Sequence, residues 1–513
     1  RGRNMSRADY RDYQIMTSPM RFLSKKQGLA LLATIAVVAM FSRVIVSSII
    51  HTDLNTIGPE GVMKDNQEIA ANEDSAELSY AIMGDMGSSG SRVYVYTYKQ
   101  SKKTNAVKCS LGEGGEYSGL SLIDGFEELN AKKKNNEMKP GVASVARGSP
   151  PYNADEYFAG LLSFAKKVVP AEKHAETPFF MYATAGLREL AEEGGERIFD
   201  DDELDENFVL EQDDEDFDSG TVAALLTAIR FTLKKSPFIF NDDHVRILTG
   251  EEEALYDWMS LQQMLHNGER SITKENDQYI DPQLMSGAFA MGVIDTGGAS
   301  SQISYLPDST LDGNQKTHVF GQQNTIVARS FLGYGMYESR SILEQEMIKR
   351  CIQSPGCKQD EIMNPCMSYN NTQHHWYNGY KYEVHGSGDF DECYTEILKI
   401  FDLPDCDAEV CGIHGVPLPK PKKGTKFLAI DNANRAASFY GYQGPSSLRM
   451  LETDVKAFCD TEWNDAMRIY GPRSNEFRIK KYCYEGVYLL ALLHYGYRFP
   501  MDTDSIIFTD YVG

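Results

Sequence analysis

The sequence predicts an α/β fold with a mixed sheet, organised as two domain-sized units. From Leu78 onward, segments with the two-residue period of a strand alternate with segments that have the period of a helix. The chain has 513 residues, of which 42% are hydrophobic and 11% aromatic, so it can bury a large core. One pattern, a strand that ends in aspartate and turns on glycines into a second strand, occurs at Asp85 and again at Asp295. This repeat favours two related units.

The N-terminal part predicts a membrane anchor. Residues 1–27 carry seven basic side chains against two aspartates, and the apolar run over residues 28–50 is long enough to cross a bilayer. Arg43 interrupts this run and should lie near the far interface, where its charge reaches water. We expect a retained signal anchor with a cytosolic basic tail, and a cleaved signal peptide is the alternative. Residues 51–77 are polar and aperiodic, which is typical of a stalk.

The part after the stalk shows the alternation most clearly. The predicted elements are, in order, strands over 78–85 and 92–99, a helix over 155–169, a strand over 179–186, a helix over 220–235 and a strand over 244–250. No solenoid period appears in the sequence. The order of elements is typical of a mixed sheet covered by helices.

The net charge of −23 argues against a nucleic-acid partner, because a phosphate backbone requires a basic face. Much of the excess lies in residues 199–220, "FDDDELDENFVLEQDDEDFDSG". We predict that this stretch is a solvated surface loop. A low-affinity calcium loop is the alternative, but the oxygen spacing of an EF-hand is absent.

Cysteine usage predicts an oxidising compartment. Eight of the nine cysteines lie in the second half of the chain, which suits four disulfides and leaves Cys109 over. Zinc is the alternative, but no C-x-x-C pair occurs and the spacings are irregular. The sequon Asn370-Asn371-Thr372 lies among these cysteines in a polar stretch and predicts a glycosylated surface loop.

The two glycine turns indicate a phosphate site. A strand that ends in aspartate and turns on glycines gathers backbone N–H groups into one concavity, which can hold phosphate oxygens. Because a carboxylate repels phosphate, Asp85 and Asp295 should act through a hydrated Mg²⁺ or Ca²⁺ ion. Either turn alone is also explained as a plain hairpin. Two matched turns favour facing phosphate loops of a duplicated, RNase H-like fold, the two-lobed arrangement of the actin and sugar-kinase superfamily.

The residues around these turns carry a family resemblance. The chain resembles the nucleoside triphosphate diphosphohydrolase (apyrase) family across roughly residues 80–510. Four motifs occur in the family's order: "DMGSSGSR" (85–92), "TPFFMYATAGLREL" (177–190), "LTGEEEALYDW" (248–258) and "IDTGGASSQIS" (294–304). Further matches are "RSFLGYGMYESR" (329–340), "NPC" (364–366), "GSGDFDEC" (386–393), "CGIHGVPLP" (411–419) and "YCYEGVYLLALL" (482–493). The cysteine-rich part is similar to the family's membrane-bound, disulfide-stabilised branch.

The resemblance implies the catalytic residues. Glu253 matches the family's catalytic base, while Ser300 and Gln302 match the residues that hold the attacking water. A hydroxyl and an amide can orient a water without competing for its proton. From spacing alone, the start of an exposed helix is the favoured interpretation of Glu253 and its neighbouring glutamates, because acids favour helix N-termini. Asp85 and Asp295 match the acids that hold the waters of the metal ion.

The resemblance also implies the substrate contacts. The residues that match the phosphate loops are Ser88, Ser89, Gly90, Ser91, Gly297, Gly298 and Ala299. Thr184 is expected to line the same site, or to be an ordinary turn threonine. Tyr482 and Arg478 match positions that flank the nucleobase, and stacking a base on tyrosine is physically reasonable. The opposing aromatic is absent, because Asp431 and Asn432 occupy that region.

The same resemblance implies an organisation for the whole chain. The expected parts are a cytosolic tail (1–27), a transmembrane anchor (28–50), a stalk (51–77), lobe I (78–249) and lobe II (250–513), and a C-terminal return to lobe I is expected beyond Gly513. By similarity, Cys406 pairs with Cys411 and Cys459 with Cys483, and two bridges form among Cys351, Cys357, Cys366 and Cys393.

Three functions are weighed. The favoured one is a metal-dependent hydrolase of nucleoside tri- or diphosphates (ATP, ADP, UDP or GDP), facing the Golgi or ER lumen or the cell exterior. A kinase of the same superfamily is disfavoured, because it needs a base aimed at a substrate hydroxyl. A catalytically silent, membrane-anchored structural relative is the main alternative, and it is suggested by Met86 and Ala254, which depart from the family pattern. A homo-oligomer is compatible with any of the three.

Overall fold

A computed structural model describes residues 78–99, 116–120, 127–128, 136–146, 153–192, 199–200, 219–266, 291–309, 314–319, 322–401 and 411–509. The predicted tail, anchor and stalk (residues 1–77) lie outside these described residues. Within the described part, no helix is both long and apolar enough to cross a membrane.

The first sheet is built around the hairpin of β1 (Leu78–Met86) and β2 (Ser91–Lys99). Its order is β4-β2-β1-β6-β8, and β5 also pairs with β2. β6 is parallel to β1, and β8 is parallel to β6. The other strands of this sheet are β4 (Glu127–Glu128), β5 (Glu137–Met138), β6 (Phe179–Ala183) and β8 (Val245–Ile247).

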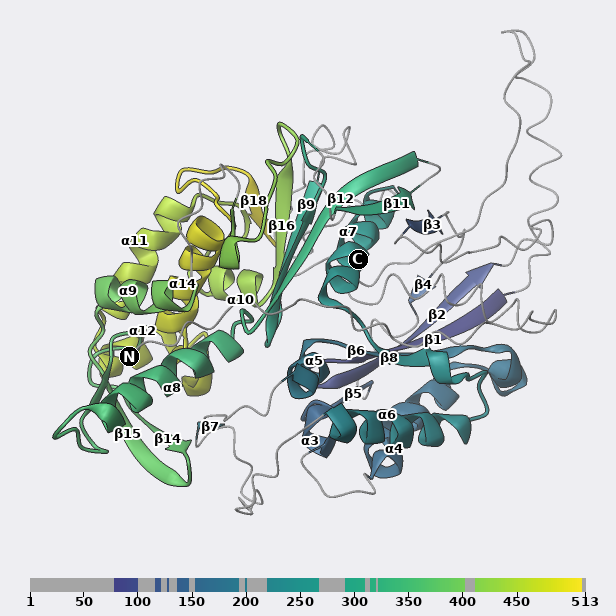
Figure 1. The fold of residues 1–513 in the computed structure, drawn as a ribbon, viewed down its shortest axis with the longest axis horizontal. Coiled ribbons are helices and arrows are strands. Elements are labelled where there is room, and N and C mark those ends of the chain that lie inside the picture. Colours follow the sequence, from purple (N-terminus) through teal and green to yellow (C-terminus); the bar gives the residue numbers. More distant parts are fainter. Residues whose placement is uncertain are drawn as a thin grey trace, which may run out of the picture.

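Helices cover the first sheet because each presents an apolar face to it. These helices are α3 (Ala143–Ala146), α4 (Ala154–Val168), α5 (Ala185–Glu192) and α6 (Ser219–Lys234). Asn153 caps α4, since its side chain accepts a hydrogen bond from the Glu156 amide. Phe158 of α4 and Ile229 of α6 pack with Phe179 of β6 in one core. Figure 1 shows α4 and α6 side by side against this sheet.

The second sheet repeats the arrangement of the first. Its order is β17-β18-β16-β9-β10-β12-β11-β3. β9 and β10 form an antiparallel hairpin, β16 is parallel to β9, and β18 is parallel to β16. The path β10-β9-β16-β18 therefore has the same strand directions as β2-β1-β6-β8. The strands are β3 (Glu116–Leu120), β9 (Met291–Thr296), β10 (Ser300–Tyr305), β11 (Gln315–Val319), β12 (Gln322–Leu332), β16 (Lys426–Asp431), β17 (Gly444–Pro445) and β18 (Ile506–Phe508). This symmetry is the structural form of the repeat in the sequence.

Helices pack on both faces of the second sheet. The helices of this half are α7 (Gly250–His266), α8 (Glu338–Gln353), α9 (Phe390–Ile400), α10 (Asn432–Phe439), α11 (Leu448–Cys459), α12 (Trp463–Tyr470), α13 (Glu476–Ile479) and α14 (Tyr482–Ala491). α7 lies against β9, β10 and β12, and α10 lies against β16 on the other side (Figure 1). Phe401, Phe458 and Tyr488 are fully buried in the core among the helices.

A small third sheet follows α8, with the order β13-β15-β14-β7. Its strands are β7 (Phe199–Asp200), β13 (Ile362–Asn364), β14 (Thr372–Tyr377) and β15 (Tyr380–Gly386). Asn370, the sequon residue, is exposed just before β14. β7 comes from the start of the acidic stretch, so residues 199–200 form a strand pair with β14 rather than a free loop. Residues 201–218 lie outside the described part.

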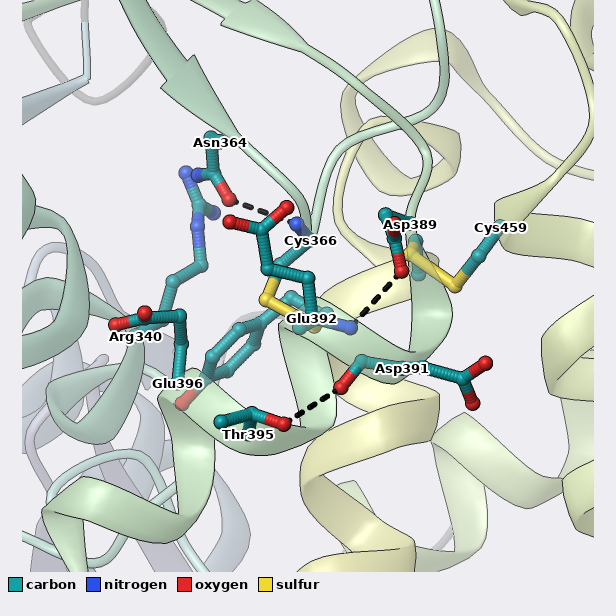
Figure 2. The surroundings of a disulfide bond; sticks show 12 residues. Arg340, Asn364, Cys366, Asp389, Asp391, Glu392, Thr395, Glu396 and Cys459 are labelled. Carbon is teal, nitrogen blue, oxygen red and sulfur yellow. Dashed lines mark hydrogen bonds between the residues drawn. A yellow bond between two sulfur atoms is a disulfide. The ribbon is translucent and has the colours of Figure 1, made fainter.

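Disulfide bonds cross-link the cysteine-rich second half of the chain. Cys459 pairs with Cys483, as predicted, and the other two described bridges are Cys351–Cys357 and Cys366–Cys393. Cys411 is also disulfide-bonded, and its expected partner Cys406 lies outside the described residues. Figure 2 shows Cys366 next to the start of α9, where the Asp389 side chain accepts a hydrogen bond from the Glu392 amide at 2.9 Å. This cap and the bridge fix the beginning of α9 together.

Candidate active site

The two glycine turns have the same local geometry. In the first, the Gly87 amide donates to the Gly90 carbonyl at 3.0 Å. In the second, the Gly297 amide donates to the Ser300 carbonyl at 2.9 Å. Each of these glycines lies two residues after an aspartate, so Asp85 and Asp295 occupy the same place in the two hairpins. Both aspartates are partly buried.

The two turns meet each other. A Cβ atom added to Gly298 would lie 2.7 Å from the Ser88 hydroxyl oxygen, so the first turn reaches the second. Gly335 packs equally closely behind the second turn, because a Cβ there would lie 2.3 Å from the Gly298 carbonyl carbon. Gly186, at the start of α5, approaches Ser88 from lobe I, with 2.8 Å between its added Cβ and the Ser88 Cα. The predicted phosphate loops are therefore neighbours.

The other residues predicted for these loops differ in exposure. Ser89 is exposed, while Gly90 and Ala299 are buried. Ser91 is fully buried, and its hydroxyl accepts a hydrogen bond from the Tyr157 hydroxyl at 3.0 Å. Thr184 is buried, and its amide donates to the Met86 carbonyl at 3.4 Å, which places it at the end of β1.

The predicted catalytic residues converge on one cluster. Glu253 lies in the first turn of α7, and Ser300 and Gln302 lie on β10, against which α7 packs. All three side chains are buried. The Gln302 side-chain amide donates to the Ser300 hydroxyl at 2.7 Å and to the Ser330 hydroxyl at 3.2 Å. This hydrogen bond fixes the Gln302 amide and the Ser300 hydroxyl relative to each other.

Arg188 links this cluster to lobe I, and sequence reasoning did not single it out. Its guanidinium donates to the Glu253 carboxylate at 2.7 Å and to the Ser300 hydroxyl at 3.4 Å. A third hydrogen bond, to the Leu248 carbonyl at 2.9 Å, fixes the guanidinium. Arg188 lies in the second motif, "ATAGLREL", but its partner lies far along the chain. The signal available in the sequence was a basic residue inside a largely apolar motif.

Electrostatics in the site are dominated by carboxylates. Burial raises the pKa of Glu253, and Arg188 opposes this effect. Burial raises the pKa of Asp85 to about 7, although Arg92 lowers it. Burial and neighbouring negative charge raise the pKa of Asp295 well above its usual value. The protein alone therefore opposes full ionisation of this cluster at neutral pH.

Two further acids join the cluster. Asp257, on α7, is fully buried, and Asp431, at the end of β16, is exposed and has a positive φ of 53°. Asp431 lies in register with Thr296 on β9, next to Asp295. Asp257 is four residues after Glu253, a spacing that places both on one helix face. The sequence analysis did not single out Asp257, although this spacing from Glu253 was visible in the sequence.

The acids fit a hydrated cation better than a directly bound one. One carboxylate oxygen of Asp85 and one of Asp295 are buried and accept no hydrogen bond within the described part of the chain. Ordered waters on Mg²⁺ or Ca²⁺ would supply such donors. No three His, Cys, Asp or Glu side chains of the described residues are grouped closely enough to ligate one ion directly.

The two predicted nucleobase residues differ in exposure. Tyr482 is 4% exposed, and its ring stacks on Phe439 with centroids 3.6 Å apart. Little of the ring is accessible for a base. Arg478 is exposed on α13. The nucleobase role of both residues stays a prediction.

The two residues that depart from the family pattern, Met86 and Ala254, are both buried. Met86 is fully buried and packs in the core of the first sheet. Ala254 is fully buried in the first turns of α7.

The chain is similar to known proteins in sequence and in fold. The model of the GDA1/CD39 (nucleoside phosphatase) family matches residues 71–213 and 218–512. Ectonucleoside triphosphate diphosphohydrolase 1 of Mus musculus is 26% identical over 450 residues, which cover 83% of this chain and 76% of the relative. Ectonucleoside triphosphate diphosphohydrolase 4 of Homo sapiens is 24% identical and covers 85% of this chain and 71% of its own length. A crystal structure of nucleoside triphosphate hydrolases from Neospora caninum shares the fold, with a TM-score of 0.50, 13% identity and coverage of 86% of this chain and 90% of that one.

Proposed function

The chain belongs to the GDA1/CD39 (nucleoside phosphatase) family, and from this premise we propose that it hydrolyses the terminal phosphate of nucleoside tri- and diphosphates with a water activated by Glu253. The observation that carries the proposal is the convergence of Glu253, Ser300 and Gln302 beside two facing glycine turns. The names of the relatives, which are ectonucleoside triphosphate diphosphohydrolases, support the same substrate class.

Glu253 has the properties of a general base. Its burial raises its pKa, which increases its affinity for the proton of the attacking water. Arg188 counters the shift and favours the ionised form, which is the form that accepts the proton. Ser300 and Gln302 hold the water by a hydroxyl and an amide, neither of which removes its proton.

The water attacks the terminal phosphorus, the bond to the bridging oxygen breaks, and the water's proton passes to Glu253. Backbone N–H groups of the two turns hold the phosphoryl oxygens, with Ser88 and Gly298 closest to each other. A divalent cation, held through water by Asp85 and Asp295, would neutralise charge on the phosphates. Positioning and charge stabilisation supply most of the rate in such reactions.

We also propose a setting for the reaction. Residues 28–50 anchor the chain in a membrane, and the catalytic part faces the lumen or the cell exterior. The disulfides Cys366–Cys393 and Cys459–Cys483 support this side, because such bridges persist in oxidising compartments.

The test is release of inorganic phosphate from ATP, ADP, UDP and GDP by the purified chain, with Mg²⁺ or Ca²⁺ and with a chelator. We expect release only with the cation. Glu253→Gln should lower kcat by at least about 100-fold while nucleotide binding remains.

Glu251→Gln is the matched control, because Glu251 begins the same helix but is exposed. It should keep wild-type turnover. Equal phosphate release by wild type and Glu253→Gln would refute the assignment of the base.

A further inference from the structure

Asp257 is a buried carboxylate that the proposed mechanism does not use. It lies on α7 one helical turn after Glu253 and is 0% exposed. The rotation of α7 is fixed by the next residue, because the Trp258 indole N–H donates to the Met291 carbonyl of β9 at 3.0 Å. Gln262 donates to the same carbonyl at 3.4 Å. Asp257 is therefore held rigidly at the face of α7 that meets β9.

Neither oxygen of Asp257 has a hydrogen-bond partner within the described residues. A buried carboxylate without donors is costly, and most buried polar groups are satisfied. The two Asp257 oxygens therefore need hydrogen-bond donors that the described residues do not supply. Water bound to a cation is such a donor.

The charges around the site point the same way. Arg188 pairs with Glu253 at 2.7 Å, and Arg92 lies 3.7 Å from Asp85. The positive charge of Arg435 lowers the pKa of Asp431, the acid at the edge of the cluster. For Asp257 and Asp295, in contrast, the charges that act from the described residues are all negative. Within the described part of the chain, these two interacting acids have no cationic side chain acting on them, so both need a positive partner.

We propose that Asp257 is a further cation-positioning residue: with Asp295, it accepts hydrogen bonds from the hydration shell of the divalent cation at the phosphate loops. The inference rests on the proposed function, because it concerns the cation of that same site. It explains why one carboxylate oxygen of Asp295 and both oxygens of Asp257 have no hydrogen-bond donor among the described residues. It also makes α7 a source of both the base and part of the cation site, so that the two are aligned by one helix.

The test measures cation binding without nucleotide. Ca²⁺ and, separately, Mg²⁺ are titrated calorimetrically into the full chain as wild type, Asp257→Asn and Glu251→Gln. We expect Asp257→Asn to weaken cation binding at least tenfold and Glu251→Gln to bind as the wild type does. Glu251→Gln removes the same charge from the same helix at an exposed position.

Thermal unfolding gives a second readout that also shows whether the variant folds. With a chelator, Asp257→Asn should unfold at a higher temperature than wild type, because a buried uncompensated acid has been removed. The rise in Tm on adding Ca²⁺ should be large for wild type and small for Asp257→Asn. If the asparagine variant does not fold, Asp257→Ser takes its place in both measurements.

Cation binding by Asp257→Asn with wild-type affinity would overturn the inference, as would a wild-type chain that binds neither cation. Phosphate release, measured on the same samples, separates the two proposals. A wild type that binds the cation but hydrolyses no nucleotide contradicts the proposed function, and the titration still decides the role of Asp257.

Discussion

At the scale of single residues, the ion pair of Arg188 and Glu253 controls the ionisation of Glu253, the proposed base. The ion pair is largely shielded from solvent, because only 10% of the Arg188 side chain and 8% of the Glu253 side chain are exposed. Burial alone would favour a neutral, protonated Glu253, which could not accept a proton. The positive charge of Arg188 favours the ionised Glu253, and its guanidinium also donates a hydrogen bond to the Ser300 hydroxyl. One guanidinium therefore acts on both the charge of the proposed base and the position of the hydroxyl that we propose holds the water.

Arg188→Ala should lower kcat by about 100-fold and move the acid limb of its pH profile upward. The sign follows from the charge: Arg188 lowers the pKa of Glu253, so its loss raises that pKa, and Glu253 becomes protonated at a higher pH. The measurement is kcat for phosphate release between pH 5 and 9.

Arg246→Ala is the matched control for this change. Arg246 pairs with Glu252 at 2.7 Å, one residue before Glu253 on the same helix. Its removal should leave the acid limb in place. An acid limb that does not move in Arg188→Ala would show that Glu253 is not the group that titrates.

At the scale of elements, the contact between α5 and the first glycine turn matters most. α5 begins beside Ser88, and Gly186 permits this approach because it has no side chain. The same helix carries Arg188 two residues further along. α5 therefore contacts the proposed phosphate loop with its first residues and the proposed base with the residues that follow.

Gly186→Ala should raise KM and lower kcat, because the added Cβ would lie 2.8 Å from the Ser88 Cα and must displace the turn. We expect a loss of at least about tenfold in kcat/KM, which corresponds to roughly 1.4 kcal/mol. Steady-state phosphate release measures it.

Gly160→Ala is the comparison, since Gly160 is an exposed glycine in α4 whose added Cβ would meet only Met138 at 3.6 Å. It should leave kcat/KM unchanged and stabilise the chain by up to about 1 kcal/mol, as alanine does in helices. Similar kinetics of the two variants would show that α5 does not hold the turn.

At the scale of the whole molecule, two similar sheets bring their hairpins together and concentrate negative charge where they meet. Asp85 comes from the first sheet, and Asp295 and Asp431 come from the second. Each acid lies at the end of a strand, where the chain turns. The duplicated topology thus gathers the acids that we propose hold a cation, and their mutual repulsion should destabilise the chain when no cation is bound.

This arrangement predicts how stability depends on pH without a cation. The pKa of Asp85 is about 7 in the folded chain and near 3.8 when unfolded. Between these values the folded state binds more protons, so the free energy of unfolding falls as pH rises from about 4 to 7, by about 1 kcal/mol per pH unit for this group.

With a chelator present, Tm should therefore be higher at pH 5.5 than at pH 7.5. Added Ca²⁺ should recover stability at pH 7.5 and have little effect at pH 5.5. Asp85→Asn should show a smaller difference between the two pH values. The measurement is thermal unfolding by circular dichroism, and a Tm difference unchanged in Asp85→Asn would contradict the role of that carboxyl.

The sequence by itself determined the local structures and the family. The hairpins at Asp85 and Asp295, the strands over 179–186 and 244–250 and the helices over 155–169 and 220–235 follow from short patterns of apolar residues, acids and glycines. Each of these is fixed by residues close together in the chain, so the pattern is visible in the sequence. The pair Cys459–Cys483 was predicted by resemblance and is confirmed.

Only the tertiary structure decided which distant residues meet. Arg188 and Glu253 are 65 positions apart, and their ion pair depends on α5 and α7 approaching from different sheets. β3 and β7 lie within the residues expected to form lobe I, yet they pair with β11 and β14 of the other two sheets. Asp257 gained its significance only when α7 placed it near Asp295. The physical reason is that such contacts depend on the packing of whole elements, and no short segment of sequence encodes that packing.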